Sequence, residues 1–378
     1  MSGNKQNKIA FLINSLGRGG AEHVVVNLAG YFQRQGHEVL LVTSRRLPEE
    51  YHVTFPIKRR LLEEEIEGAP FGRVGKVAAR LLHLRRIWKE EAPDVVLSFI
   101  GKMNLYALLS AAGMHLPVIV SVRSDPDREY PSPLQKKLAD LLFRRAAGVI
   151  FQTQDAKRAF SPAVQRLGAV LPNALDESFV RPCYEGERRD EIVMVGRLDE
   201  NKNHALLFRA FAGMAKEYPH VTIALYGSGL PGSDTEPMLR ALARELEIAD
   251  QVLFMGRQSG IREKIERARL FVLASDYEGM PNALLEAMAS GLAVISTDCP
   301  CGGPRSVIRH MENGILIPVG DEAALAGALR LLLDDPALAE RLGREAAKVS
   351  RELSPERVYR LWQEETESRV KAYVGGQS

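Results

Sequence analysis

Short apolar runs alternate with amphipathic segments along most of the chain. In the first half, five runs typical of buried strands lie at residues 9–13, 38–43, 95–99, 118–122 and 148–151. Helical periodicity fills the intervals between them, for example at residues 21–35 and 74–89. Strands that alternate with helices are typical of βαβ units and therefore predict a parallel sheet.

The same pattern begins again after residue 190. Five further apolar runs lie at residues 191–195, 221–226, 252–255, 270–274 and 293–296, and helical segments follow at 322–333, 336–351 and 355–373. Two such series predict an α/β protein with two doubly wound, Rossmann-like domains. We expect the first at residues 1–185, the second at 186–355 and a C-terminal helix at 356–378. Two such domains facing each other would form a deep cleft beyond the carboxyl ends of their strands, where ligands of open parallel sheets bind.

Composition excludes several classes of protein. The 378 residues are 46% hydrophobic and 26% charged, which is typical of a globular protein with a substantial core. No apolar run approaches the ~18–20 residues that a membrane-spanning helix needs, and the polar residues 1–8 do not resemble a secretory signal. Three cysteines give no disulfide framework, so we expect a protein of a reducing cytoplasm.

The charges are distributed unevenly. Residues 1–185 hold 26 Lys and Arg against 19 Asp and Glu, a net charge of +7, whereas residues 186–378 hold 24 against 29, a net charge of −5. A basic half suggests an anionic partner, such as a phosphate group or a membrane surface. Drift in surface composition explains the same numbers equally well. Aromatic residues make up only 7% of the chain and do not cluster with the cations, so we expect no nucleic-acid partner.

A glycine-rich loop follows the first predicted strand. Gly17, Gly19 and Gly20 precede a helix, so the backbone could approach a ligand closely and the helix N-terminus could offer N–H groups to an anion. The acidic residue of the dinucleotide fingerprint is absent from the end of the second strand. A phosphate-binding loop and a plain strand-to-helix turn both remain possible on this pattern alone.

Two cations follow the first strand of the second series. Arg197 and Lys202 lie in a strand-to-helix loop, where a guanidinium and an ammonium could hold a diphosphate from one side. A solvated loop with an incidental salt bridge is the competing interpretation.

The most specific pattern pairs two carboxylates eight residues apart. Glu278 lies in the loop after a strand, and Glu286 lies about two turns into the next helix. Residues 279–283 would present backbone amides at the start of that helix, where anions bind. A carboxylate at a cleft can accept hydrogen bonds from the vicinal hydroxyls of a sugar or a ribose. Glu286 is flanked by four apolar residues, which argues against two ordinary surface carboxylates.

Together these segments resemble the family 4 retaining glycosyltransferases, which have the GT-B fold. Glu278 and Glu286 match the E-x7-E motif of that family, Arg197 and Lys202 match its basic pair, and residues 17–20 match its N-terminal glycine loop. Further stretches, at 19–22, 202–204 and 299–304, resemble bacterial enzymes of surface-polysaccharide and lipid-linked oligosaccharide assembly. Several of those enzymes use UDP-GalNAc, UDP-Gal or UDP-GlcNAc.

The resemblance implies a role for each matching position. The N-terminal domain would bind the acceptor, the C-terminal domain the nucleotide sugar, and the last helix would return to the N-terminal domain. Glu286 would hold the ribose, Glu278 would face the donor sugar, and Arg197 with Lys202 would neutralise the leaving phosphate. The remaining donor-site positions would be Gly17, Gly19, Gly227, Arg257, Gly279, Met280, Pro281 and Asn282. No metal or other cofactor is expected, because the basic pair would take the place of a metal ion.

One position departs from the family pattern. Many members place a histidine after the fourth strand of the first domain, and here the corresponding residue is Arg123, six residues after Pro117. A guanidinium cannot act as a base, although it can bind a phosphate or the acceptor. The role usually given to that histidine is therefore open in this chain.

The predicted helix at 74–89 carries a second candidate acceptor contact. Arg73, Lys76 and Arg80 recur at helical spacing and could face anionic headgroups or the diphosphate of a polyprenyl-linked glycan. Peripheral association with the cytoplasmic face of the inner membrane would follow. An ordinary amphipathic helix with a solvated basic face is the alternative.

The sequence therefore predicts a metal-independent hexosyltransferase that moves a hexose or N-acetylhexosamine from a UDP-sugar to a glycan acceptor. Cys299 and Cys301 lack the second thiol pair of a structural zinc site, and the glycines and prolines around them favour a rigid loop over the donor site. Two alternatives stay open: another GT-B reaction such as a nucleotide-sugar epimerase, and a non-catalytic glycan- or nucleotide-binding protein.

Overall fold

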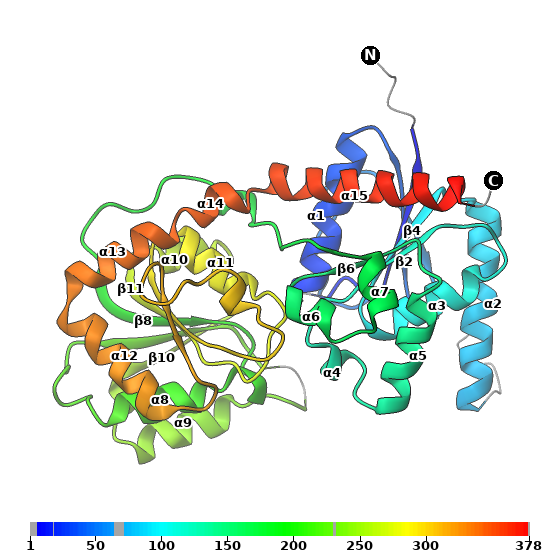
Figure 1. Ribbon diagram of the computed structural model, residues 1–378. Coiled ribbons are helices and arrows are strands. Elements are labelled where there is room, and N and C mark those ends of the chain that lie inside the picture. The colour runs from blue at the N-terminus through cyan, green and yellow to red at the C-terminus, as the bar shows by residue number, and fades with distance from the viewer. Residues whose placement is uncertain (1–5, 18, 64–71, 230–231, 377–378) are drawn as a thin grey trace. The chain divides into compact units, whose positions relative to one another are not determined.

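The computed structural model describes residues 6–17, 19–63, 72–229 and 232–376. The chain forms two compact units. One consists of Met1–Asn173 together with Val358–Ser378, and the other is Ala174–Arg357. Each unit is a parallel sheet between helices (Figure 1).

The first unit contains a seven-stranded parallel sheet in the order β3-β2-β1-β4-β5-β6-β7. Its strands are β1 (Lys8–Ile13), β2 (Glu38–Thr43), β3 (Lys58–Leu61), β4 (Val95–Phe99), β5 (Val118–Ser121), β6 (Gly148–Phe151) and β7 (Gly168–Val170). The five apolar runs predicted in this half are all strands. Their residues are buried almost throughout, because helices cover both faces of the sheet.

The helices of this unit are α1 (Gly20–Arg34), α2 (Arg73–Glu91), α3 (Gly101–Ala111), α4 (Pro126–Glu129), α5 (Pro133–Phe143), α6 (Gln154–Arg158), α7 (Pro162–Leu167) and the greater part of α15 (Pro355–Gly375). The C-terminal helix α15 packs on this unit, as the family resemblance implies. Trp362 is buried and stacks on Phe99 with ring centroids 5.7 Å apart, and Tyr359 lies 5.5 Å from Tyr31. An aromatic anchor of this kind holds the last helix through apolar burial.

The second unit contains a six-stranded parallel sheet in the order β10-β9-β8-β11-β12-β13. Its strands are β8 (Arg189–Val195), β9 (Thr222–Tyr226), β10 (Val252–Gly256), β11 (Ala268–Leu273), β12 (Ala293–Thr297) and β13 (Ile315–Ile317). Its helices are α8 (His204–Ala212), α9 (Glu236–Glu245), α10 (Ile261–Ile265), α11 (Asn282–Ala289), α12 (Glu322–Asp334), α13 (Pro336–Ala346) and α14 (Val349–Glu352), with short 3-10 turns η1 (Glu177–Phe179), η2 (Glu200–Lys202), η3 (Ala249–Gln251) and η4 (Pro304–Ser306). The single helix expected at 336–351 is two helices, α13 and α14.

The boundary between the units differs from the expected position after residue 185. Residues 174–185 belong to the second unit, because their backbone is held there by hydrogen bonds. The Arg262 guanidinium, 1% exposed, donates to the carbonyls of Ser178, Arg181 and Pro182, and Leu175 N donates to Leu353 O at 2.9 Å. A polar, proline-containing stretch therefore looks like a linker in the sequence but is fixed by a buried arginine.

Among the described residues, no helix is both long and apolar enough to cross a membrane.

Candidate active site

The second unit brings the loops after β8 and β11 together. From β8 the chain moves outward to β9 and β10, whereas β11, β12 and β13 lie on the other side of β8. The strand order therefore reverses between β8 and β11, and open α/β sheets bind ligands at such a reversal. Arg197 and Lys202 follow β8, and Glu278 follows β11.

Lys202 and Glu278 form an ion pair at this position. The contact joins Lys202 Nζ to Glu278 Oε1 across 76 residues of sequence, and the side chains are only 16% and 13% exposed. Ser275 Oγ donates a 2.8 Å hydrogen bond to the same carboxylate oxygen. Thr297 Oγ1, at the end of β12, donates to the Ser275 carbonyl at 2.6 Å. Two residues that the sequence assigned to phosphate and sugar thus contact each other directly.

Arg197 occupies a different environment from Lys202. Its side chain is 53% exposed and pairs with Asp199 at 3.1 Å, through Nη2 and Oδ2. The other oxygen of Asp199 accepts a hydrogen bond from Lys202 N at 3.2 Å and so caps the turn η2. Each member of the basic pair is therefore matched with its own carboxylate, and Arg197 is the more accessible of the two.

Two asparagines that sequence reasoning missed tie the loops together. Asn201 Nδ2 donates to Tyr277 O at 3.1 Å, while Asn201 Oδ1 accepts from Tyr277 N at 3.2 Å. Asn203 Nδ2 donates to Asp276 Oδ1 at 3.0 Å, and Asn203 adopts the left-handed conformation that starts α8. Their proximity to Lys202 in sequence was the only available signal, because the partner loop is distant in the chain.

Glycines allow the neighbouring loops to approach closely. Gly227 has φ +148°, and a Cβ at that position would lie 1.7 Å from Gly196 O. A Cβ on Gly303 would lie 1.6 Å from Gly279 O, so Gly303 lies directly against the backbone that follows Glu278. Any larger residue at either position would force these backbone segments apart.

Helix α11 carries the second glutamate. Residues 279–281 are buried ahead of it, and Asn282 begins the helix. Glu286 is half-buried, although the residues on either side of it, Leu284, Leu285, Ala287 and Met288, are fully buried. Arg257, which follows β10, is exposed.

Burial also sets the protonation state of two groups beside Lys202. Burial and the nearby ammonium of Lys202 lower the pKa of His204 to about 4, so this imidazole is neutral at pH 7. Burial and the charge of Glu278 raise the pKa of Cys299 to about 12, so this thiol remains protonated. Cys301 lies two residues on, with φ +73°. Within the described ranges, no three His, Cys, Asp or Glu side chains gather as potential metal ligands.

The glycine loop of the first unit is anchored by a glutamate. Gly17 forms an isolated bridge with Glu50, and Gly19 N donates to Gly17 O at 2.7 Å. Glu50 Oε1 accepts from Leu16 N at 3.3 Å, and Arg59 binds both carboxylate oxygens at 2.6 and 3.0 Å. Sequence reasoning missed Glu50, whose contribution depends on a turn more than 30 residues beyond the loop.

Arg123 is 8% exposed and held in a polar cluster. Its Nη2 donates to Asn173 Oδ1, and its guanidinium carbon lies 5.9 Å from the Trp362 ring centroid. Its backbone N donates to Glu129 Oε1 at 2.5 Å. Burial lowers the pKa of Arg123 to about 10, so the side chain is still a cation at pH 7. Its Nε and Nη1 make no hydrogen bond within the part of the chain that the structure describes.

The basic residues of α2 are not all alike. Lys76 is exposed, but Arg80 is half-buried and pairs with Glu63 at 3.1 Å. Arg73 begins the helix, and its side chain lies outside the described residues. The helix is fixed at its other end, where Trp88 is buried and donates to Ser110 Oγ at 2.8 Å.

Comparison with known families now identifies the chain. Residues 182–349 match the family described as glycosyl transferases group 1, and residues 18–179 match glycosyltransferase family 4. A Rhizobium meliloti lipopolysaccharide core biosynthesis glycosyltransferase, LpsD, is 31% identical over 68% of this chain and 70% of its own length. The chain belongs to the family 4 glycosyltransferases.

Two further relatives cover nearly the whole length. A Campylobacter jejuni α-1,4-N-acetyl-D-galactosaminyltransferase, named for a PP-undecaprenol-linked glycan, is 24% identical over 94% of this chain and 97% of its own. The crystal structure of Anabaena HepE with UDP and glucose superposes with a TM-score of 0.81 at 20% identity, covering 96% of this chain and all of that one. The second likeness confirms the GT-B fold.

Proposed function

We propose that this glycosyltransferase moves a hexose or N-acetylhexosamine from a UDP-sugar to a lipid-diphosphate-linked glycan, with retention of the anomeric configuration. The proposal rests on one observation: Lys202 and Glu278 form an ion pair just ahead of α11, at the point where the strand order of the sheet reverses. A cation, a carboxylate and a helix N-terminus are the groups that a sugar diphosphate requires.

Each group has a distinct task in this proposal. Lys202 and Arg197 neutralise the charge that builds on the diphosphate as the glycosidic bond breaks, which stabilises the transition state more than the ground state. The amides at the start of α11 bind the same diphosphate, and Glu286 accepts hydrogen bonds from the ribose hydroxyls. Glu278 turns from Lys202 to the hydroxyls of the donor sugar. Gly227 and Arg257 line the nucleotide side of the site, and the glycine loop of the first unit, with Gly17 and Gly19, remains a predicted diphosphate-binding loop.

The first unit supplies the acceptor site in this proposal. The Campylobacter relative is named for a glycan on PP-undecaprenol, and we infer the same class of acceptor for this chain. Lys76 and Arg123 are the cations suited to its diphosphate, whereas Arg80 would first have to leave Glu63. Such an acceptor places the reaction at the cytoplasmic face of the inner membrane.

A panel of sugar nucleotides tests the proposal. UDP-GalNAc, UDP-Gal, UDP-GlcNAc and UDP-Glc are each incubated with a short-chain polyprenyl-diphosphate glycan, with and without EDTA. We expect one donor to release UDP in the presence of acceptor, at a rate that EDTA leaves unchanged. The anomeric coupling constant of the product, measured by NMR, decides between retention and inversion.

The outcomes separate the alternatives. An epimerase would convert one UDP-sugar into another with no acceptor and no release of UDP. A binding protein would release no UDP from any donor. Complete loss of activity in EDTA, restored by a divalent ion, would show that the phosphate is neutralised by a metal instead of by Arg197 and Lys202.

A further inference from the structure

Helix α5 of the first unit is apolar on two faces, and only one of them is covered. Ala139, Leu142 and Phe143 are buried against the unit, as the inner face of an amphipathic helix should be. Leu134, Leu138 and Leu141 recur at helical spacing on a different side and are 77%, 41% and 54% exposed. We call these three residues the leucine stripe. A row of large apolar side chains on a solvent-exposed face marks an interaction surface.

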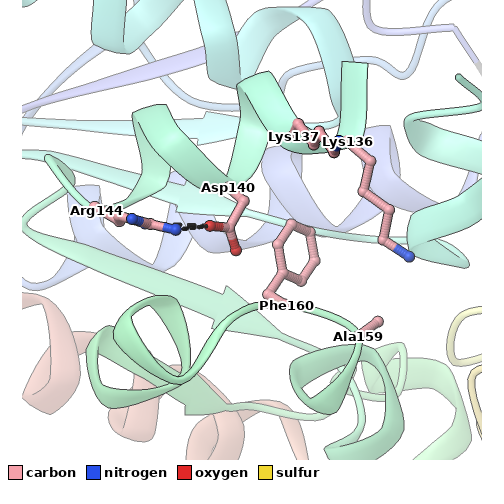
Figure 2. A pocket seen from close by; sticks show the side chains of 6 residues that line it. All are labelled: Lys136, Lys137, Asp140, Arg144, Ala159 and Phe160. Carbon is pink, nitrogen blue, oxygen red and sulfur yellow. Dashed lines mark hydrogen bonds and ion pairs between the residues drawn. The ribbon is translucent and has the colours of Figure 1, made fainter. Parts of the chain in front are cut away.

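Cations lie directly beside the leucine stripe. A pocket of about 280 Å³ lies between α5 and residues 159–160. Figure 2 shows Lys136, Lys137 and Arg144 on its helix side. Lys136 pairs with Asp127, and Arg144 pairs with Asp140 at 2.6 Å but remains 50% exposed. Lys137 is exposed. The Phe160 ring forms the apolar floor of the pocket. One side of α5 thus offers apolar contact, and the adjoining side offers positive charge.

The helices near α5 also expose large apolar side chains. Helix α3 packs against both α5 and α2. Leu109 of α3 is 40% exposed, and Leu82 of α2 is 69% exposed.

We propose that the leucine stripe inserts into an anionic lipid surface and that the basic pocket beside it binds lipid phosphates. Helices that lie in a membrane interface combine leucines on one face with lysines and arginines beside them, and the long cationic side chains reach the headgroups. A second copy of this chain fits less well, because a stripe one side chain wide and ~10 Å long falls well short of the ~800 Å² per partner of a stable interface. The cations favour anionic lipid, since each contributes attraction to a negatively charged leaflet.

This inference rests on the proposed function in one respect only: membrane binding would bring the active site to a lipid-linked acceptor. It differs from a membrane role for the basic residues of α2, because the apolar contact comes from α5. It can therefore be tested without any enzymatic reaction.

The test is co-sedimentation with vesicles of equal parts phosphatidylglycerol and phosphatidylcholine, compared with vesicles of phosphatidylcholine alone. The variant carries Leu134→Ser, Leu138→Ser and Leu141→Ser. The matched control carries Met238→Ser, Val319→Ser and Leu331→Ser, which are similarly exposed residues of the second unit. We expect the wild type and the control to bind the anionic vesicles and the stripe variant to bind about tenfold or more weakly. Lys137→Gln with Arg144→Gln should weaken binding roughly fivefold per cation and reduce its dependence on salt.

Enzymatic readouts complete the test. Transfer to a short-chain, soluble acceptor should be unchanged in the stripe variant, whereas transfer to a long-chain acceptor in vesicles should fall with binding. Unchanged vesicle binding by the stripe variant would overturn the inference. So would a wild-type dimer that becomes monomeric in the stripe variant while vesicle binding persists, since the stripe would then join two copies. Absence of UDP release from every donor, with the expected vesicle binding, would refute the proposed function and leave this inference standing.

Discussion

The ion pair between Lys202 and Glu278 leads to a prediction in which a second substitution restores stability but does not restore activity. In Lys202→Met, the Glu278 carboxylate loses its counter-ion but keeps the hydrogen bond from Ser275. In the double variant Lys202→Met with Glu278→Gln, no buried charge remains. We expect the single variant to be the less stable of the two, although the double variant departs further from the wild type.

The magnitude follows from the burial of the pair. Removing one partner of a fully buried ion pair costs about 3–5 kcal/mol, whereas replacing both partners is often close to neutral. Because 16% and 13% of the two side chains still reach solvent, we expect a smaller cost of about 2–3 kcal/mol for Lys202→Met and about 0–1 kcal/mol for the double variant. For a unit of this size, the single variant should therefore melt about 4–12 °C lower, and the double variant should recover most of the loss.

Activity should not follow stability. Loss of an electrostatic contact to the developing negative charge lowers turnover by about a hundredfold or more, and restoring the fold does not restore the cation. Melting is measured by circular dichroism and turnover by UDP release, with Lys216→Met, at a side chain 93% exposed, as the control for loss of a lysine.

Two results would refute this reasoning. If the double variant were as unstable as Lys202→Met, the buried charge of Glu278 would not be the cause of the instability. If the double variant regained turnover, Lys202 would serve only to neutralise Glu278 and would have no part in holding phosphate.

Three further predictions concern neighbouring residues. Arg197→Ala should lower turnover by about a hundredfold while melting within ~4 °C of the wild type, because an exposed ion pair contributes about 0–1 kcal/mol. Near-normal turnover in this variant would remove Arg197 from the site. Glu286→Ala should weaken binding of free UDP in calorimetry, whereas Glu278→Ala should bind UDP normally and turn over slowly; equal loss of affinity would contradict the division of roles. His204 is neutral in the fold, with its pKa lowered to about 4 by burial and by Lys202, so its contribution to stability is present above pH 6.5 and is lost as pH falls toward 4, by up to about 3 kcal/mol. Melting temperature against pH should consequently fall less steeply below pH 6.5 in His204→Leu, and parallel profiles would exclude this group as the cause.

The strands could be predicted from the sequence where burial on both faces leaves a continuous apolar run. All ten predicted runs are strands. Strand β3 was missed because its sequence, Lys-Arg-Arg-Leu, has one apolar residue; it is an edge strand whose Arg60 pairs with the buried Glu91. Strands β7 and β13 were missed because three residues are too few to show a pattern.

The sequence singles out Lys202 and Glu278 as candidate site residues, but it does not predict the contact between them. Glu278 and Glu286 are only eight residues apart, so their spacing can be read directly from the sequence. The contact between Lys202 and Glu278 depends on β8 and β11 being neighbours, and strand order cannot be read from alternating apolar runs. The burial of Arg123 against Trp362 depends in the same way on where the last helix docks.

The resting ion pair also explains why the two glutamates should behave differently toward UDP. Lysine has a long, flexible side chain, and the contact with Glu278 fixes its ammonium before any ligand arrives. An incoming diphosphate carries more negative charge than one carboxylate and can take over the ammonium, which frees Glu278 for the sugar hydroxyls. In the proposed function, UDP binding to the wild type therefore includes the cost of separating Lys202 from Glu278, and a variant without the Glu278 carboxylate should be spared that cost. Loss of Glu278 should for this reason slow transfer without weakening the binding of UDP, whereas loss of Glu286, which we assign to the ribose hydroxyls, should lower the affinity for UDP directly.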